Sequence, residues 1–318
     1  MALRTRLTER LGIRHPILSA PMGGTAGGTL AAAVTAAGGL GLIGGGRSPP
    51  EWIDEQFAAA GNQRVGCGFI TWGFPPEALS AAISHSPVTI MFSFGDASSF
   101  LPRVKAAGIP VICQVQTVAM AREALSLGAD IIIAQGAEAG GHGMRRSTLP
   151  LVPAVVDAVN EMRGDALVIA AGGIADGRGL AAALMLGADG VMMGTRFHVS
   201  EESLVSPAAK TRIIGASGDE TVRTNVFDVG LETPWPTHFT GRGLANRFTE
   251  TWHGRETALA ADTVAKLAYQ AARDAADFNT FVLWAGEGID LVRAVEPAGV
   301  IVERVAVEAE AALARRFD

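Results

Sequence analysis

The chain has few charged residues, and this shortage excludes some functional classes. Only 18% of its 318 residues are charged, and Asp and Glu outnumber Lys and Arg, which gives a net charge of −6. No run of Lys or Arg is longer than a pair, so the basic patch of a nucleic-acid-binding protein is missing. We therefore expect no nucleic-acid partner.

Cysteine is also scarce. Cys67 and Cys113 are the only two, and they lie far apart in the sequence. They form no CxxC pair, and two cysteines are too few for the disulfide framework of a small secreted domain. We expect both to be buried as small apolar side chains, in a protein of the reducing cytoplasm.

Two common catalytic motifs are absent. The six histidines include no HxxxH pair, and the sequence has no GxSxG segment. The first would be typical of a zinc site, and the second of the nucleophile elbow of a hydrolase. We expect no metal centre.

Long apolar segments that could cross a membrane are missing as well. Residues 17–46 carry no charge and are longer than the ~20 residues of a spanning helix. The segment is nevertheless rich in glycine, is interrupted by Pro21, and has no basic flank of the kind that precedes a signal-type cleavage site. We expect no membrane span.

Glycine, in contrast, is abundant, with 39 residues in a chain that is 48% hydrophobic. This composition is typical of many buried strands joined by tight turns. Gly39, Gly41 and Gly44 formally match the dinucleotide-binding pattern GxGxxG. They fall within and just after a strand candidate, and no acidic residue follows at the spacing that holds a ribose, so we treat the match as chance.

Short apolar runs alternate with helix-like segments along most of the chain, which predicts a (β/α)8 TIM barrel. The strand candidates are Ile17–Ser19, Leu40–Ile43, Val65–Ile70, Thr89–Phe92, Val111–Val115, Ile131–Ala134, Leu167–Ala171 and Gly190–Met193. The helix candidates are Thr29–Ala37, Pro50–Ala60, Pro76–Ser84, Ser99–Ala107, Val118–Leu127, Pro150–Met162 and Arg178–Leu186. The sequence LGAD recurs at 127–130 and 186–189, which indicates equivalent units. An open doubly wound sheet is the alternative, but regular units with continuously buried strands favour closure.

The alternation stops after Thr195, so we divide the chain into three parts. Residues 1–215 are expected to form the barrel, and residues 216–283 a smaller, mostly helical cap that acts as a substrate domain. Residues 284–318 are expected to return to the barrel, with helices at Glu287–Leu291 and Val300–Arg316 that could supply its last outer helix.

The segment AQGAEAGGHG at 134–143 directly follows the sixth strand candidate. In a barrel it would lie at the mouth, where loops after the strands carry the reactive groups. His142 is therefore a candidate functional residue, whereas Glu138 is more typical of a hydrogen-bond acceptor that braces the loop. Trp72, Trp235 and Trp284 are candidates for the core or for a pocket wall.

Further glycine clusters end the first, seventh and eighth strands. Gly172, Gly173, Gly194 and Thr195 predict a phosphate cradle made of backbone N–H groups and a hydroxyl. In APMGG, which follows the first strand, Pro21 and Met22 could pack against a flat apolar ring.

These motifs together resemble the nitronate monooxygenases, formerly called 2-nitropropane dioxygenases, which are FMN-dependent TIM-barrel enzymes. The matching segments run from HPILSAPMGG at 15–24 through AQGAEAGGHG, AAGGIADGRG at 170–179 and MMGTRF at 192–197 to WAGEGIDLVRAV at 284–295. The resemblance implies His142 as the catalytic base. The FMN-binding residues that it implies are Pro21, Met22, Gly23, Gln114, Gln135, Gly140, Gly172, Gly173, Met192, Met193, Gly194 and Thr195.

The chain departs from the family pattern at three places. Gly68 replaces a typical Asn, Gln114 stands where some relatives have Lys, and Gly143 and Met144 follow His142 where HRG is common. A lost positive charge at Gln114 could change how reduced flavin is stabilised or which substrate is accepted.

The resemblance implies oxidation of alkyl nitronates or nitroalkanes with O2 to carbonyl compounds and nitrite. An imidazole can remove the acidic proton next to a nitro group. Two alternatives stay open: an NAD(P)H-dependent flavin reductase on the same fold, acting on quinones or enoyl thioesters, and a non-catalytic flavin- or phosphate-binding barrel. The physiological substrate and the oligomeric state, including a homodimer, are also open at this point.

Overall fold

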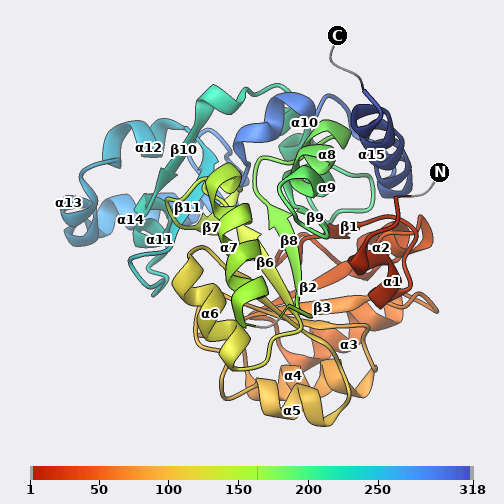
Figure 1. The fold of residues 1–318 in the computed structure, drawn as a ribbon. Coiled ribbons are helices and arrows are strands. Elements are labelled where there is room, and N and C mark those ends of the chain that lie inside the picture. Colours follow the sequence, from red (N-terminus) through yellow and green to blue (C-terminus); the bar gives the residue numbers. More distant parts are fainter. Residues whose placement is uncertain (1–2, 163, 316–318) are drawn as a thin grey trace.

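Eight parallel strands form the central sheet of the computed structural model, which describes residues 3–162 and 164–315 (Figure 1). The strands are β1 (Ile17–Ser19), β2 (Leu42–Gly46), β3 (Gly66–Ile70), β4 (Ile90–Ser93), β5 (Val111–Val115), β6 (Ile131–Gln135), β8 (Leu167–Ala171) and β9 (Gly190–Met193). They pair in the order β1-β9-β8-β6-β5-β4-β3-β2. A parallel bridge between Leu18 and Leu40 joins the two ends of this order. The sheet is therefore a closed barrel, and the predicted TIM barrel is confirmed.

Alternate strand residues fill two different layers, because successive side chains of a strand point to opposite faces. Leu18, Met91 and Ile133 belong to the cluster inside the barrel, together with Leu7 and Leu11 of α1 (Arg6–Leu11). The intervening strand residues pack under the outer helices. The barrel is thus a filled core, open to a ligand only at its rim.

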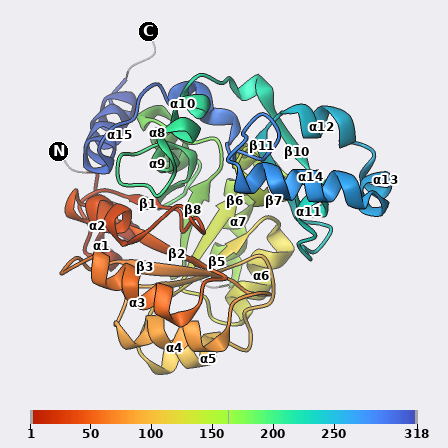
Figure 2. The same cartoon turned by 180° about the vertical axis from the view of Figure 1, so that it is seen from behind.

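The outer helices follow the strands as the sequence predicts. They are α2 (Gly28–Ala36), α3 (Pro50–Ala59), α4 (Pro76–Ser84), α5 (Leu101–Ala106), α6 (Val118–Ser126), α7 (Thr148–Met162), α8 (Gly177–Met185) and α15 (Ala298–Leu313). Helix α15 packs against α8 and α2 and completes the outer ring (Figure 2). Arg316, the predicted end of this last helix, lies outside the described residues.

The two LGAD segments have the same structural role. Gly128 and Gly187 both end a helix with positive φ, at 88° and 91°, a conformation that suits glycine. Asp130 and Asp189 then each accept a hydrogen bond from a backbone N–H at the start of a neighbouring strand, at 3.0 and 2.9 Å. The repeat therefore marks equivalent helix-to-strand junctions of the barrel.

Both cysteines are buried and free, as predicted. Burial raises the pKa of the Cys67 thiol and of the Cys113 thiol to about 12, so neither is a ready nucleophile. The segment 17–46 forms β1, α2 and β2 instead of one long helix. None of the helices in the described part of the chain has the length and apolar character needed to span a bilayer.

Beyond β9 the chain forms α9 (Thr195–His198) and α10 (Pro207–Ile214), and then the elements of the cap. These are η1 (Gly218–Glu220), β10 (Thr221–Thr224), α11 (Val226–Leu231), β11 (Thr240–Leu244), α12 (Arg247–Trp252), α13 (Glu256–Ala261) and α14 (Thr263–Asp274). Both views show α11–α14 gathered at one side of the barrel, away from α15 (Figures 1 and 2). The chain returns to the barrel through η2 (Glu287–Leu291).

The cap contains strands that the sequence analysis did not anticipate. β10 and β11 form an antiparallel three-stranded sheet with β7 (Gly141–Gly143), which is part of the loop after β6. His142 lies opposite Gly241 in this sheet. The loop that carries the candidate histidine is therefore a strand of the cap sheet.

Candidate active site

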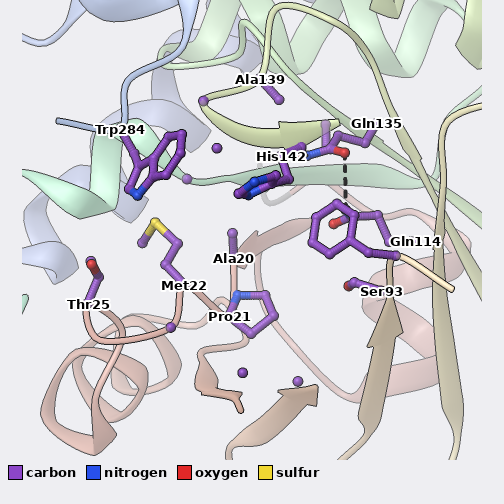
Figure 3. A pocket seen from close by; sticks show the side chains of 18 of the residues that line it. Ala20, Pro21, Met22, Thr25, Ser93, Gln114, Gln135, Ala139, His142 and Trp284 are labelled. Atoms are coloured by element: carbon purple, nitrogen blue, oxygen red, sulfur yellow. Dashed lines mark hydrogen bonds between the residues drawn. The ribbon is translucent and has the colours of Figure 1, made fainter. Parts of the chain in front are cut away.

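A cavity of about 520 Å³ lies at the carboxyl ends of the barrel strands (Figure 3). Its size is within the ~300–1,000 Å³ range of small-molecule sites. Most residues that we predicted for the site line this cavity: Pro21, Met22, Gly23, Gln114, Gln135, Gly140, His142, Gly172, Gly173, Met192, Gly194 and Thr195. The loops after β1, β6, β8 and β9 thus converge on one place.

Met193 is the exception among the predicted site residues. Its side chain is fully buried in the layer between the strands and the outer helices. Because neighbouring residues of a strand face opposite ways, Met192 points to the barrel interior and Met193 away from it. The contribution of Met193 is structural, since its carbonyl oxygen accepts a hydrogen bond from the Ala20 N–H at 3.0 Å.

Glycine is sterically required at one end of the cavity. Gly172 and Gly173 have φ of 108° and 70°, and a Cβ at Gly140 would lie 2.7 Å from the Ala285 backbone. The Thr195 hydroxyl accepts a hydrogen bond from the Gly286 N–H at 3.0 Å, which holds the last segment of the chain against the cavity. This end of the site is therefore built mainly of backbone.

Another part of the cavity wall is apolar. Figure 3 shows Ala20, Pro21 and Met22 across from His142, with Trp284 at the side. One departure from the family pattern, Gly68 in place of Asn, fits the structure. A Cβ at this position would come within 2.4 Å of the Pro21 ring. An Asn at this position would need Pro21 to move.

His142 is nearly buried and is held by contacts on two sides. Its Nε2 atom lies 2.9 and 3.0 Å from the two carboxylate oxygens of Asp228 on α11. The side chains of His142 and Asp228 are only 10% and 9% exposed. The Trp235 ring stacks on the imidazole with centroids 3.4 Å apart and planes 7° apart. These contacts fix the orientation of the imidazole ring.

Three hydrogen-bonded glutamine side chains support the backbone of His142. The Gln135 Oε1 accepts a hydrogen bond from Gln114 Nε2 at 3.1 Å (Figure 3). It accepts a second one from Gln116 Nε2 at 2.8 Å. The Gln135 Nε2 in turn donates to the His142 carbonyl oxygen at 3.1 Å. Strands β5 and β6 therefore set the position of β7.

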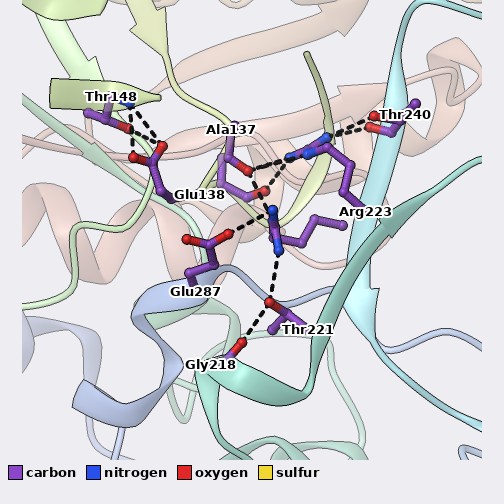
Figure 4. Close-up of polar contacts among 10 residues, drawn as sticks. Ala137, Glu138, Thr148, Gly218, Thr221, Arg223, Thr240 and Glu287 are labelled. Atoms are coloured by element: carbon purple, nitrogen blue, oxygen red, sulfur yellow. Dashed lines mark hydrogen bonds and ion pairs between the residues drawn. The ribbon is translucent and has the colours of Figure 1, made fainter. Parts of the chain in front are cut away.

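Two arginines from the cap sheet hold the loop before His142, and Figure 4 shows one of them, Arg223, beside Ala137. Arg223 Nη2 donates to the carbonyl oxygens of Ala137 and Ala139, both at 2.8 Å. Arg242 Nε donates to the same Ala137 carbonyl at 2.9 Å and pairs with Glu287 at 2.7 Å. Burial, followed by the nearby charge of Arg242, lowers the pKa of Arg223 to about 10.

Glu138 braces the same loop, as predicted. Its carboxylate accepts hydrogen bonds from the Thr148 N–H at 2.9 and 3.0 Å and from the Thr148 hydroxyl at 2.8 Å (Figure 4). Both oxygens are occupied by the first residue of α7. Glu138 is therefore engaged in structure and is not a second base.

Several lining residues were missed by sequence reasoning or left undecided. Trp235 and Trp284 line the cavity, whereas Trp72 packs edge-on against Trp235 at 4.8 Å. No local sequence pattern links Asp228 to His142, because the two residues lie 86 positions apart. His198 also lines the cavity, and burial, together with Lys210, lowers its pKa to about 4.

A closed parallel barrel with a glycine-lined cavity and a buried histidine at its mouth is the architecture of a TIM-barrel enzyme. Comparison of the sequence with known families shows which family of this class the chain matches. The family described as nitronate monooxygenase matches residues 4–62 and 77–308, and the chain belongs to this family of oxidoreductases.

Three similar proteins illustrate the range of the family. Nitronate monooxygenase npaC of Metarhizium robertsii is 34% identical, over 93% of this chain and 91% of its own. A second relative, from Mycobacterium tuberculosis, is (3aS,4S,5R,7aS)-5-hydroxy-7a-methyl-1-oxo-octahydro-1H-indene-4-carboxyl-CoA dehydrogenase. It is 40% identical, over 72% of this chain and 65% of its own. The structure of FabK from Thermotoga maritima has a TM-score of 0.85 and 33% identity, and the match covers 97% of both chains.

Proposed function

We propose that this protein catalyses the FMN-dependent oxidation of alkyl nitronates or nitroalkanes with O2 to carbonyl compounds and nitrite. The observation that carries the proposal is the position of His142. It is a buried histidine inside the mouth cavity, paired with Asp228 and facing the Pro21–Met22 turn. The relatives named nitronate monooxygenase support the same reaction.

The cavity suits FMN on structural grounds. The backbone-lined end around Gly173, Gly194 and Thr195 would take the phosphate through N–H groups. The apolar region formed by Pro21, Met22 and neighbouring residues would take the ring system. Flavin binding is a property of the family, which supports this assignment. FMN supplies the electron acceptance and the reaction with O2 that amino-acid side chains do not provide.

The side chains of this chain would then handle the substrate. His142 accepts the proton of the carbon next to the nitro group, and the backbone N–H groups of the glycine loop stabilise the nitronate oxygens. Trp235, Trp284 and Phe94 surround the imidazole, and their rings would exclude water from it. Asp228, Leu231 and Trp235 come from residues 216–283, which supports the proposal that this segment is a substrate domain.

A second candidate is an NAD(P)H-dependent flavin reductase that acts on an enoyl thioester. It is favoured by the similarity to a carboxyl-CoA dehydrogenase and to FabK, an enoyl reductase. The same His142 would act on a carbon next to a thioester carbonyl. The two candidates differ in what reduces the flavin.

The test is anaerobic mixing of the purified, flavin-loaded protein with one reductant at a time. We expect rapid bleaching of the flavin absorbance with nitroethane or ethyl nitronate and slow or no bleaching with NADH or NADPH. Rapid bleaching with NADH or NADPH but with neither nitro compound would favour the second candidate instead. Failure of the protein to bind any flavin would remove both.

The first prediction concerns His142 itself. His142→Asn keeps a polar side chain but cannot accept the proton, so turnover of nitroethane should fall by about 100-fold or more, the usual range for loss of a general base. Turnover of preformed ethyl nitronate should persist. Nitrite release measured with each substrate checks this, and unchanged nitroethane turnover would remove His142 as the base.

A further inference from the structure

Asp228 is an unusual neighbour for a site that would bind an anion. Among the described residues, Asp228 and Arg47 are the only side chains lining the cavity that carry a formal charge when the histidines are neutral. Arg47 is exposed and lies over the Trp72 ring, 5.1 Å from its centroid. Asp228 is buried against His142. The charge beside the proposed base is therefore negative.

The contact also selects one form of the imidazole. A carboxylate only accepts hydrogen bonds, so the Nε2 atom that faces Asp228 must carry a proton. A neutral His142 then has its lone pair on Nδ1. No partner within residues 3–162 and 164–315 has a hydrogen bond to Nδ1. The stacked Trp235 keeps the ring from turning over.

From these contacts we infer that Asp228 and His142 form a dyad that selects neutral carbon acids, such as nitroalkanes, over preformed nitronate anions. The inference rests on the proposed function and narrows its substrate class. A neutral imidazole beside a carboxylate carries a net charge of −1, which repels a bound anion but not a neutral substrate. An already anionic substrate has no proton to give, and this charge repels it.

The proton transfer balances within the site. The C–H bond next to the nitro group breaks, and its electron pair remains on the substrate as the delocalised nitronate. The proton bonds to His142 Nδ1, and the resulting imidazolium stays paired with the Asp228 carboxylate. Asp228 takes up no proton and acts through His142, so it is a positioning residue.

The test compares Asp228→Asn with the unaltered holoenzyme on two substrates, nitroethane and freshly prepared ethyl nitronate. We expect kcat/KM for nitroethane to fall about 100-fold, because the amide can hold the wrong tautomer and removes the charge. For ethyl nitronate we expect kcat/KM to stay within about threefold or to rise. A loss of stability alone would lower both values together, and that result would overturn the inference.

Asp274→Asn is the matched control. Asp274 is an exposed residue of α14 that pairs with Arg273 at 2.9 Å, so the variant removes the same charge from the cap without touching His142. Both substrates should be turned over as by the unaltered protein.

A second measurement does not depend on activity. In protein labelled with 15N-histidine, the ring nitrogen shifts report which nitrogen carries the proton, and His142→Gln identifies the signals. At a pH where the ring is neutral, we expect protonated Nε2 and unprotonated Nδ1. The opposite tautomer would overturn the dyad. If the protein oxidised neither substrate, the proposed function would fall, while the tautomer would still decide whether the dyad exists.

Discussion

At the scale of single residues, the shape of the cavity depends on positions where a side chain cannot fit. Gly173 has a φ of 70°, and a Cβ there would come within 3.1 Å of the Glu138 Cβ. Gly68 leaves room for the Pro21 ring. These contacts show why the glycine clusters of the sequence meet at the cavity: each glycine allows a backbone segment or a ring to approach where a Cβ would intrude.

We expect Gly173→Ala to weaken FMN binding by about tenfold and to destabilise the fold by about 1 kcal/mol, because alanine is strained at positive φ. Gly108→Ala is the control, since Gly108 has a similar φ of 71° and does not line the cavity. Fluorescence titration with FMN and thermal unfolding measure the two effects. Equal FMN affinity in both variants would argue against the cradle.

Other residues of the site could not be predicted from the sequence. His142 stood out because it follows a strand and sits among glycines. Asp228 and Trp235 contact His142 because β11 pairs with β7, which places α11 over the barrel mouth. No local pattern records a contact between residues so far apart.

At the scale of elements, the predictable parts are those with long apolar runs. All eight barrel strands were predicted to within a few residues, because each is buried on both faces and reads as a continuous hydrophobic run. β7 and β11 were not, since Gly141–Gly143 and Thr240–Leu244 are rich in glycine and have no alternation. Their pairing is stabilised by arginines instead.

Arg223 of β10 gives the test at this scale. Arg223→Met keeps much of the apolar stem but removes the donors to the Ala137, Ala139 and Thr240 carbonyls. We expect a loss of about 2–4 kcal/mol in the free energy of unfolding, because buried acceptors lose their partners. Arg273→Met, at an exposed ion pair of α14, should change it by less than about 0.5 kcal/mol. Urea unfolding compares the two.

At the scale of the whole molecule, one buried histidine makes stability depend on pH. Burial, with a smaller contribution from Lys210, lowers the pKa of His198 to about 4, from 6.5 in its ordinary state. Between these two pH values the unfolded chain binds the proton and the folded chain does not. The stability contributed by neutral His198 is therefore complete above pH 6.5 and is lost progressively as the pH falls towards 4.

We expect His198→Leu to flatten this dependence. The unaltered protein should lose on the order of 3 kcal/mol between pH 7 and pH 4 from this group alone. Chemical unfolding across that range measures the slope. His253→Gln, at an exposed histidine, should keep the slope of the unaltered protein. A slope that is the same in His198→Leu would show that other groups cause the acid sensitivity.

The shared sheet of β7, β10 and β11 has a consequence for how such proteins can be recombined. The histidine is encoded in the barrel half of the chain, but its strand partners and its carboxylate are encoded in residues 216–283. Grafting that segment alone from a relative would give β7 foreign edges and a foreign partner. In a functional chimera of two family members, residues 136–147 and 216–283 should therefore both come from the same parent protein.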